Sequence, residues 1–177
     1  MVVNYHNSAE EAREVEALIN AAGGNAFSFR ADVAVLADVE RMFDMCMTEF
    51  GGIDILVNNA GASKYSLVTS MGEEEWDEVL DTNLKGTFFC CRAALKRMVP
   101  RGVGSIVNIA SIWGLVGAAC EAHYSAAKGG VIAFTKAPLG RLGTPDDVAA
   151  CALYLASADS DFLTGQVISP NGGFVIV

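Results

Sequence analysis

The fold class is indicated most clearly by Ile53-Asp54-Ile55-Leu56-Val57, followed directly by Asn58-Asn59-Ala60-Gly61. The first five residues have the length of a strand and are apolar apart from Asp54. A strand that is apolar on both faces is typical of a parallel sheet, which helices cover on both sides. The small and polar residues 58–61 then fall at the carboxyl end of this strand, which is the edge at which doubly wound sheets bind ligands.

The same alternation of strand and helix signals extends along the chain. Short apolar segments predict strands at residues 2–5, 26–29, 53–57, 105–109 and, after a turn, 162–168. Helical spacing and end signals predict helices after Ser8, around Val39–Met47, over Glu74–Met98 with a break near Asn83, over Tyr124–Lys136, and from Thr144 to about Ala156. Strands that alternate with helices imply an α/β fold, a doubly wound parallel sheet with helices on both faces.

The alternation is irregular at two places. The chain opens at what should be a second strand, with no first strand and no Gly-rich turn before Val2. At Ala137-Pro138 a helix runs into proline, and no strand separates it from the next helix, although the strand–helix rhythm requires one. We therefore expect one domain over residues 1–177, and we expect further segments of the natural protein before Met1 and between Ala137 and Pro138.

Composition excludes several classes of protein. The chain is 52% hydrophobic and 19% charged, as expected of a folded globular domain. Its net charge of −9 argues against a nucleic-acid partner. No apolar run is long enough for a membrane span, and residues 1–7 do not resemble a signal peptide. Five cysteines without a CxxC spacing and two histidines predict reduced thiols in a cytoplasmic protein and no metal site.

The pattern Tyr124-Ser-Ala-Ala-Lys128 carries the strongest chemical signal. Positions i and i+4 of a helix share one face, so both side chains would point into the same cleft. A free phenol has a pKa of about 10, and a neighbouring ammonium favours its ionised form. Tyr124 could then exchange a proton with a carbonyl oxygen or an alcohol. A YxxxK pair is also common on ordinary helix surfaces.

Three further features fall at strand ends or within the long helix. Ser111 follows a buried strand, where its hydroxyl could bond a substrate carbonyl or cap the next turn. Asn83 could hold a water near Lys128, or it could bond the backbone and kink its helix. Asp32-Val33 could contact an adenine amino group, or Asp32 could cap the following helix. Their order along the chain is the order that a nucleotide-binding cleft requires.

Together these motifs resemble the short-chain dehydrogenase/reductase family. The shared set comprises Asn58-Asn59-Ala60-Gly61, Asn83, Ser111 and Tyr124 with Lys128, with gaps of 28 residues from Asn83 to Ser111 and 13 from Ser111 to Tyr124. The likeness extends to the segment that begins Pro138-Leu-Gly-Arg, to Thr164-Gly165-Gln166 and to Asn171-Gly172-Gly173.

The resemblance implies a Rossmann-like fold, a nicotinamide cofactor and a role for each motif residue. Tyr124 would donate the proton, and Lys128 would favour its ionised form and bind the nicotinamide ribose. Ser111 would polarise the carbonyl, and Asn83 would hold a relay water. The adenosine end of the cofactor would be lined by Asp32, Val33, Asn59, Ala60 and Gly61. The family also implies a homotetramer, in which the helices over Glu74–Met98 and Tyr124–Lys136 pack between subunits.

The family's Gly-rich pyrophosphate turn should precede Val2, and its Pro-Gly nicotinamide segment and substrate loop should lie between Ala137 and Pro138. Neither segment is present in the sequence. The two positions where they would be expected are the two irregular places described above. A protein without the first of these could not hold pyrophosphate at a helix N-terminus.

Within the family, the segment after Tyr124 and the Asn4-Tyr5-His6-Asn7-Ser8 segment are similar to those of 3-oxoacyl-[acyl-carrier-protein] reductases of fatty acid biosynthesis. The resemblance implies reduction of a 3-oxoacyl thioester, free or bound to a carrier protein. No acid follows Val2-Val3 to bind a ribose 2′-hydroxyl, which favours NADP(H) over NAD(H), and no arginine is present there either. Two alternatives stay open: an NAD(P)-dependent sugar or secondary-alcohol dehydrogenase, and a catalytically silent subunit or interaction protein.

Overall fold

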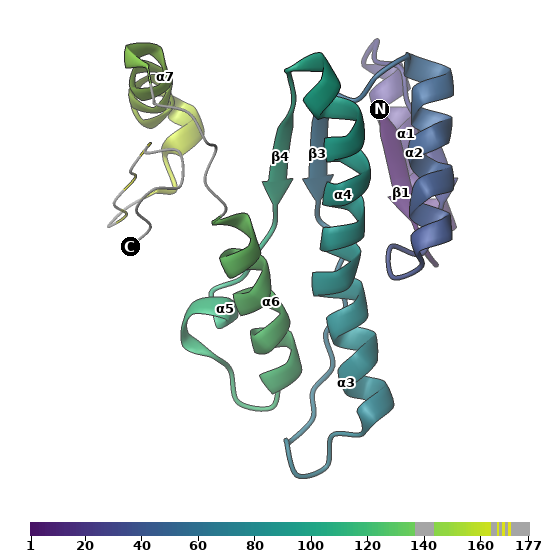
Figure 1. Cartoon of the computed structure of the whole chain (residues 1–177), viewed down its shortest axis with the longest axis vertical. Coiled ribbons are helices and arrows are strands. Elements are labelled where there is room, and N and C mark those ends of the chain that lie inside the picture. The colour runs from purple at the N-terminus through teal and green to yellow at the C-terminus, as the bar shows by residue number, and fades with distance from the viewer. Residues whose placement is uncertain (137–143, 164–165, 167, 169, 171–177) are drawn as a thin grey trace. The chain divides into compact units, whose positions relative to one another are not determined.

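Parallel strands and helices alternate in the computed structural model of the chain (Figure 1). The structure describes residues 1–136 and 144–163, together with residues 166, 168 and 170. Two units are distinguished, Met1–Ile132 and Ala133–Val177. The strands are β1 (Val2–Tyr5), β2 (Phe27–Arg30), β3 (Ile55–Asn58) and β4 (Ser105–Asn108). The α-helices are α1 (Ala9–Ala21), α2 (Leu36–Phe50), α3 (Glu73–Leu80), α4 (Gly86–Met98), α5 (Trp113–Val116), α6 (Ala122–Thr135) and α7 (Pro145–Leu155).

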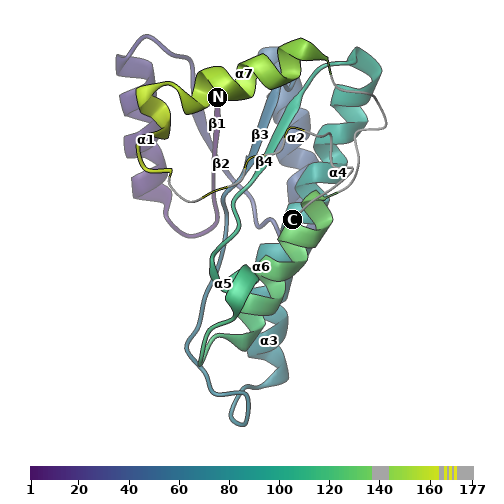
Figure 2. The ribbon, with the colours of Figure 1, turned by 90° about the vertical axis from the view of Figure 1, so that its left-hand side faces the viewer.

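The strands pair in parallel, as the sequence predicts. β1 pairs with β2 in a register that sets Tyr5 opposite Arg30, and β3 pairs with β4 so that Asn58 lies opposite Asn108. Figure 2 shows β3 and β4 running side by side. Among the described residues the predicted sheet is thus present as two parallel pairs, β1–β2 and β3–β4.

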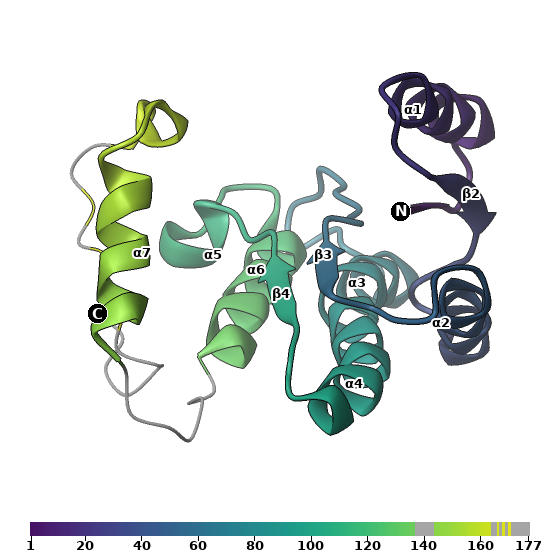
Figure 3. The ribbon, with the colours of Figure 1, turned by 90° about the horizontal axis from the view of Figure 1, so that it is seen from above.

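Helices cover these strands and supply the core. Seen from above, α1 and α2 lie on opposite sides of the β1–β2 pair (Figure 3). α2 packs against α4, and α4 packs against β3. Val39, Phe43, Cys90, Ala94 and Met98 are buried together between these elements. Burial of apolar side chains from α2 and α4 is therefore what stabilises this half of the unit.

One face of β3 is largely exposed within the unit Met1–Ile132. Leu56 packs against the core, but Ile55 is 68% exposed and Val57 54% exposed. The apolar sequence of the strand shows only that both faces tolerate burial.

The long helix contains no break. α3 continues through a π-helical turn, Asp81–Lys85, directly into α4 (Figure 1). The turn occurs where we expected an interruption, near Asn83. A π turn inserts one residue without ending the helix, and such turns are frequent at functional sites. The side-chain bonds of Asn83 to backbone carbonyls therefore occur on a π turn within one continuous helix rather than at an interruption.

Local end signals are confirmed for two helices and only partly for a third. Gly51 ends α2 in the left-handed conformation with φ of 73°. Thr144 and Asp147 form a reciprocal capping box before α7, with Pro145 in its first turn. Ser8 occupies the N-cap position of α1, but its hydroxyl makes no capping hydrogen bond.

The five cysteines are free thiols, and Cys90 and Cys91 are buried. Burial raises the pKa of Cys90 to about 12, which keeps this thiol protonated and unreactive. The described residues contain no cluster of three or more potential metal ligands. No helix in the described part of the chain is long and apolar enough to cross a membrane.

Several predictions fall outside the described residues. These are the junction at Ala137-Pro138, the segment 138–143 and the Asn171-Gly172-Gly173 motif. Thr164 and Gly165 are also outside them, as is part of the strand expected at residues 162–168. The turn expected before that strand is present at Asp161 and Phe162.

Candidate active site

The carboxyl ends of β3 and β4 form one edge. Asn58 and Asn108 end the two strands opposite each other, and the Ile109 amide continues the pairing by donating to the Asn58 carbonyl over 3.0 Å. The exposed residues Asn59, Ala60 and Gly61 follow β3 at this edge, and Ser111 follows β4. Two motifs that lie 50 residues apart in the sequence are therefore brought to the same edge by parallel pairing.

Lys128 reaches this edge from α6. Its side chain is buried, with 4% of the residue exposed, and Nζ donates a hydrogen bond of 2.7 Å to the Ile109 carbonyl. The same ammonium lies 5.7 Å from the centre of the Tyr124 ring, while Tyr124 itself is half-buried. Burial lowers the pKa of Lys128 because the ammonium has lost water. The pair thus shares one face of α6, with a desolvated cation beside the phenol.

Ser111 lies on a turn that presses against α6. Its Oγ accepts a hydrogen bond of 3.2 Å from the Trp113 amide at the start of α5, as in the capping interpretation. The hydroxyl proton is not used in that bond, so it can still be donated. A Cβ on Gly114 would lie 2.7 Å from the backbone carbon of Lys128. Only glycine allows this approach, which holds the Ser111 turn against the helix that carries Lys128.

Asn83 joins the π turn to the loop after β3. The residue is fully buried, and Nδ2 donates to the Val79 carbonyl over 2.8 Å and to the Ala62 carbonyl over 2.7 Å. Oδ1 is buried without a hydrogen-bond partner, and a Cβ on Gly61 would lie 2.7 Å from it. The structure therefore shows the backbone-bonding interpretation of Asn83 and leaves one acceptor free.

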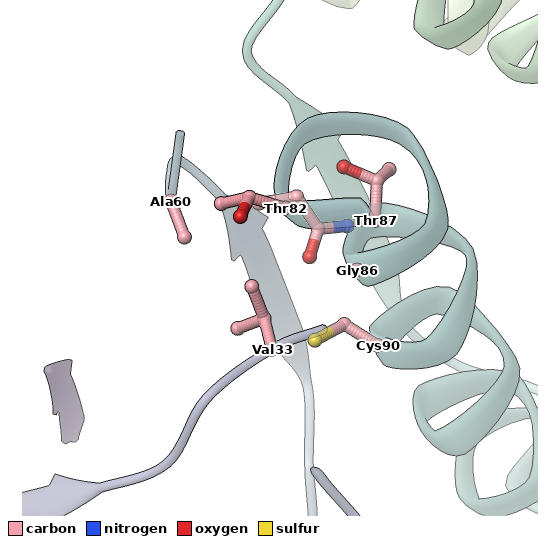
Figure 4. Close-up of a pocket in the computed structure, with 7 residues that line it drawn as sticks. Val33, Ala60, Thr82, Gly86, Thr87 and Cys90 are labelled. Carbon is pink, nitrogen blue, oxygen red and sulfur yellow. The ribbon is translucent and has the colours of Figure 1, made fainter. Parts of the chain in front are cut away.

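A small pocket lies beside this junction (Figure 4). Its lining combines residues after β2, at the end of β3 and on the π turn and α4: Val33, Asn58, Ala60, Thr82, Gly86, Thr87 and Cys90. A Cβ on Gly86 would lie 2.8 Å from Val33 Cγ2, so the missing side chain lets the loop after β2 approach α4. Val33 and Ala60, both predicted to line the cofactor, contribute to the same pocket.

Asp32 occupies the edge of the β1–β2 pair. Its Oδ1 accepts a hydrogen bond of 2.9 Å from the Ala34 amide, and its Oδ2 lies 3.8 Å from His6 Nε2. The carboxylate thus stabilises its own loop by an Asx turn. It does not cap α2, whose N-cap position is Val35. The side chain retains acceptor capacity toward solvent, because carboxylate oxygens have several lone pairs.

Sequence reasoning missed a polar network beneath the edge. Asn58 Nδ2 donates to Asn108 Oδ1 over 2.8 Å and to Cys91 Sγ over 3.2 Å. This network ties β3, β4 and α4 together at the residues that precede both motifs. Each partner lies more than 30 residues from Asn58, so no local pattern could reveal it.

The segment before Tyr124 also carries groups that the sequence did not single out. Glu121 is buried and accepts a hydrogen bond from Ser63 Oγ, in the loop after β3. His123 is fully buried, with Nε2 3.4 Å from Glu75 Oε1 on α3. Both contacts fix the start of α6, and therefore Tyr124, against the β3 loop and α3. In the sequence, Glu121 and His123 are marked only by their position next to Tyr124.

The structure thus places a buried lysine beside a tyrosine at the ends of parallel strands, and sequence comparison shows the family. The family model described as short chain dehydrogenase matches residues 1–164. The chain belongs to the short chain dehydrogenase family. It is accordingly an NAD(P)-dependent oxidoreductase with a Rossmann-like α/β fold.

Among curated proteins, the chain is similar to 3-oxoacyl-[acyl-carrier-protein] reductases of three organisms. It is 35% identical over 213 residues to FabG of Staphylococcus aureus (strain N315), covering 98% of this chain and 87% of that protein. FabG of Staphylococcus epidermidis (strain ATCC 12228 / FDA PCI 1200) is 34% identical with the same coverage. The reductase of Synechocystis sp. is 35% identical over 214 residues, covering 99% and 87%.

The residues at the edge fit two parts of a nicotinamide cofactor. Lys128 uses one hydrogen bond on Ile109 and keeps further donors for ribose hydroxyls. Asn59, Ala60 and Gly61 are small and exposed, which permits close approach of an adenosine group.

The Asn83 junction yields a testable prediction. Asn83→Ala removes two buried hydrogen bonds to backbone carbonyls, so we expect the free energy of unfolding to fall by about 1–3 kcal/mol. Because the Ala62 carbonyl and Gly61 lose their anchor, turnover per folded molecule should fall as well. Urea denaturation and steady-state kinetics measure the two effects.

Asn20→Ala is the matched control for this variant. Asn20 also joins its helix to a following segment through two bonds, both to Ala26. We expect it to lower stability while turnover per folded molecule stays unchanged. Equal turnover in the Asn83 and Asn20 variants would contradict a role for Asn83 in shaping the site.

Proposed function

We propose that this protein reduces 3-oxoacyl thioesters to 3-hydroxyacyl thioesters with NADPH, using Asn83, Ser111, Tyr124 and Lys128. The observation that carries the proposal is the buried Lys128 ammonium, bonded to the Ile109 carbonyl and 5.7 Å from the Tyr124 ring. Burying a cation is costly. The burial of the Lys128 ammonium therefore supports a role in which its charge acts on a neighbouring group or on a ligand.

The proposed chemistry assigns the proton to Tyr124. Its hydroxyl donates a proton to the substrate carbonyl oxygen, and Ser111 Oγ donates a hydrogen bond to that same oxygen as negative charge develops on it. The Lys128 ammonium stabilises the phenolate that remains and keeps donors for the nicotinamide ribose. When bound, the nicotinamide cofactor supplies the hydride that the carbonyl carbon receives. The free Oδ1 of Asn83 can accept a bond from a water that returns the proton.

Substrate and cofactor choice are supported by different observations. The relatives named above are 3-oxoacyl-[acyl-carrier-protein] reductases, which supports a 3-oxoacyl thioester and a carrier protein as partner. Residues 6–8 after β1 contain no acid that would bind a ribose 2′-hydroxyl, which supports NADP(H). Asp32, Val33, Asn59, Ala60 and Gly61 are the proposed adenosine contacts.

Tyr124→Phe tests the mechanism. With acetoacetyl-CoA as substrate, we expect NADPH oxidation by the unaltered protein and turnover at least about 100-fold lower in the variant, because the proton donor is lost. The fold should persist, since only a hydroxyl is removed. Tyr154→Phe, at an exposed tyrosine of α7, is the matched control and should keep full turnover.

Other outcomes of the same assay discriminate the alternatives. Near-normal turnover in Tyr124→Phe would contradict the mechanism. Turnover of a sugar or secondary alcohol with NAD, but none of the thioester, would favour an alcohol dehydrogenase. If no substrate turns over with either cofactor, the interpretation as a silent subunit gains support.

We also propose a cytoplasmic homotetramer that packs through the helices over Glu74–Met98 and Tyr124–Lys136. Trp76 and Leu95 on the first of these are 38% and 45% exposed, and exposed apolar surface supports an interface. Light scattering of the purified protein should give the mass of a tetramer. A monomer mass at micromolar concentration would contradict this assembly.

A further inference from the structure

The residue directly before Tyr124 is a fully buried histidine. His123 lies in the first turn of α6 and has no accessible surface. Among the described residues, neither nitrogen of its ring has a hydrogen-bond partner. Buried polar atoms of folded proteins almost always have such a partner, so an imidazole in this state requires an explanation.

One carboxylate faces this imidazole. Glu75 lies in the first turn of α3, and its Oε1 is 3.4 Å from His123 Nε2. Oε1 is itself buried and lacks a hydrogen-bond partner in the part of the chain that the structure describes. The two atoms therefore meet as a donor nitrogen and an acceptor oxygen, which a small side-chain rotation would align. The neighbouring cation of the loop after β3, Lys64, pairs with Glu78, three residues further along α3.

The backbone just before this histidine is strained and held in place. Cys120 has a φ of 64°, a left-handed conformation that is costly for a residue with a side chain. Its carbonyl accepts a hydrogen bond of 2.8 Å from the Ser66 amide, and the Glu121 carboxylate accepts one from Ser63 Oγ. Strain of this kind persists where the surroundings fix the conformation, and it occurs most often at functional sites. The loop after β3 thus holds the segment before α6 independently of Glu75.

We propose that His123 and Glu75 form a positioning pair for the catalytic phenol, in which their contact fixes the first turn of α6 to α3 and so sets the position of the Tyr124 hydroxyl. The inference rests on the function proposed above. Tyr124 is the next residue of the same turn, so a shift of that turn moves its hydroxyl relative to the substrate carbonyl. A misplacement of about 1 Å at a reacting group lowers a rate by roughly 100-fold. Because His123 is buried and Glu75 lies on α3, the pair acts through Tyr124 and not on the substrate itself.

Two substitutions remove the contact from opposite sides. His123→Phe keeps a buried ring, and Glu75→Leu removes the carboxylate of a side chain that is 25% exposed. With NADPH and acetoacetyl-CoA, we expect kcat per folded molecule to fall by about 10- to 100-fold in each variant. The affinity for NADPH, measured by fluorescence titration, should stay unchanged because Lys128 and the strand ends are unaltered. Glu75→Gln keeps an acceptor oxygen at the same place, so its turnover should lie well above that of Glu75→Leu.

A second comparison separates positioning from a general disturbance of the site. In the Tyr124→Phe background no hydroxyl is left to position, so the added His123→Phe should lower the residual turnover hardly further. Glu78→Leu is the control variant. It removes a carboxylate three residues further along α3, whose exposed pair with Lys64 contributes little, and it should keep full turnover.

Each other outcome contradicts a distinct statement. Full turnover in a stably folded His123→Phe or Glu75→Leu protein would overturn the inference and leave the reductase proposal standing. An equal further loss in the Tyr124→Phe background would show a general disturbance of the site and would also overturn it. If His123→Phe does not fold, Glu75→Leu gives the decisive result. No turnover of any substrate by the unaltered protein would contradict the proposed function, and this inference with it.

Discussion

The burial of the Lys128 ammonium is the constraint on which the site depends. Its bond to the Ile109 carbonyl links α6 to the residue directly after β4, and its proximity to the Tyr124 ring fixes the phenol at the same edge. A lowered pKa of Lys128 follows from the loss of water around it. Two elements meet at this ammonium. The residue after β4 provides the carbonyl that accepts its hydrogen bond, and α6 carries Lys128 and Tyr124 on one face.

Close approaches between backbone segments hold the rest of the site around this group. Gly114 lets the Ser111 turn rest on α6, and Gly86 lets the loop with Val33 rest on α4. The π turn provides the side chain of Asn83, which anchors the loop after β3 through the Ala62 carbonyl. Glycine residues and the π turn thus position the candidate site, in which Tyr124 and Lys128 lie on a regular helix, Ser111 follows a strand and Asn83 lies on the π turn itself.

Local signals explain which features the sequence could predict. The alternation of elements, the Tyr124–Lys128 spacing and the Thr144 capping box depend on residues within one or two turns of each other. The Asn58–Asn108 bond joins two distant strands, and the π turn in place of a break carries the Asn83 bond to the distant Ala62 carbonyl. The apolar sequence of β3 shows that both of its faces tolerate burial, but it does not show which element lies on each face.

The most direct test of the account is Lys128→Met, measured for both stability and NADPH-dependent turnover of acetoacetyl-CoA. Methionine keeps an unbranched apolar stem and removes a buried charge, but it also leaves the Ile109 carbonyl without this donor. We predict that the unfolding free energy falls by no more than about 1–3 kcal/mol, so that the variant still folds. Turnover should fall by at least about 100-fold. Retained turnover in a stably folded Lys128→Met protein would contradict the central role of this ammonium.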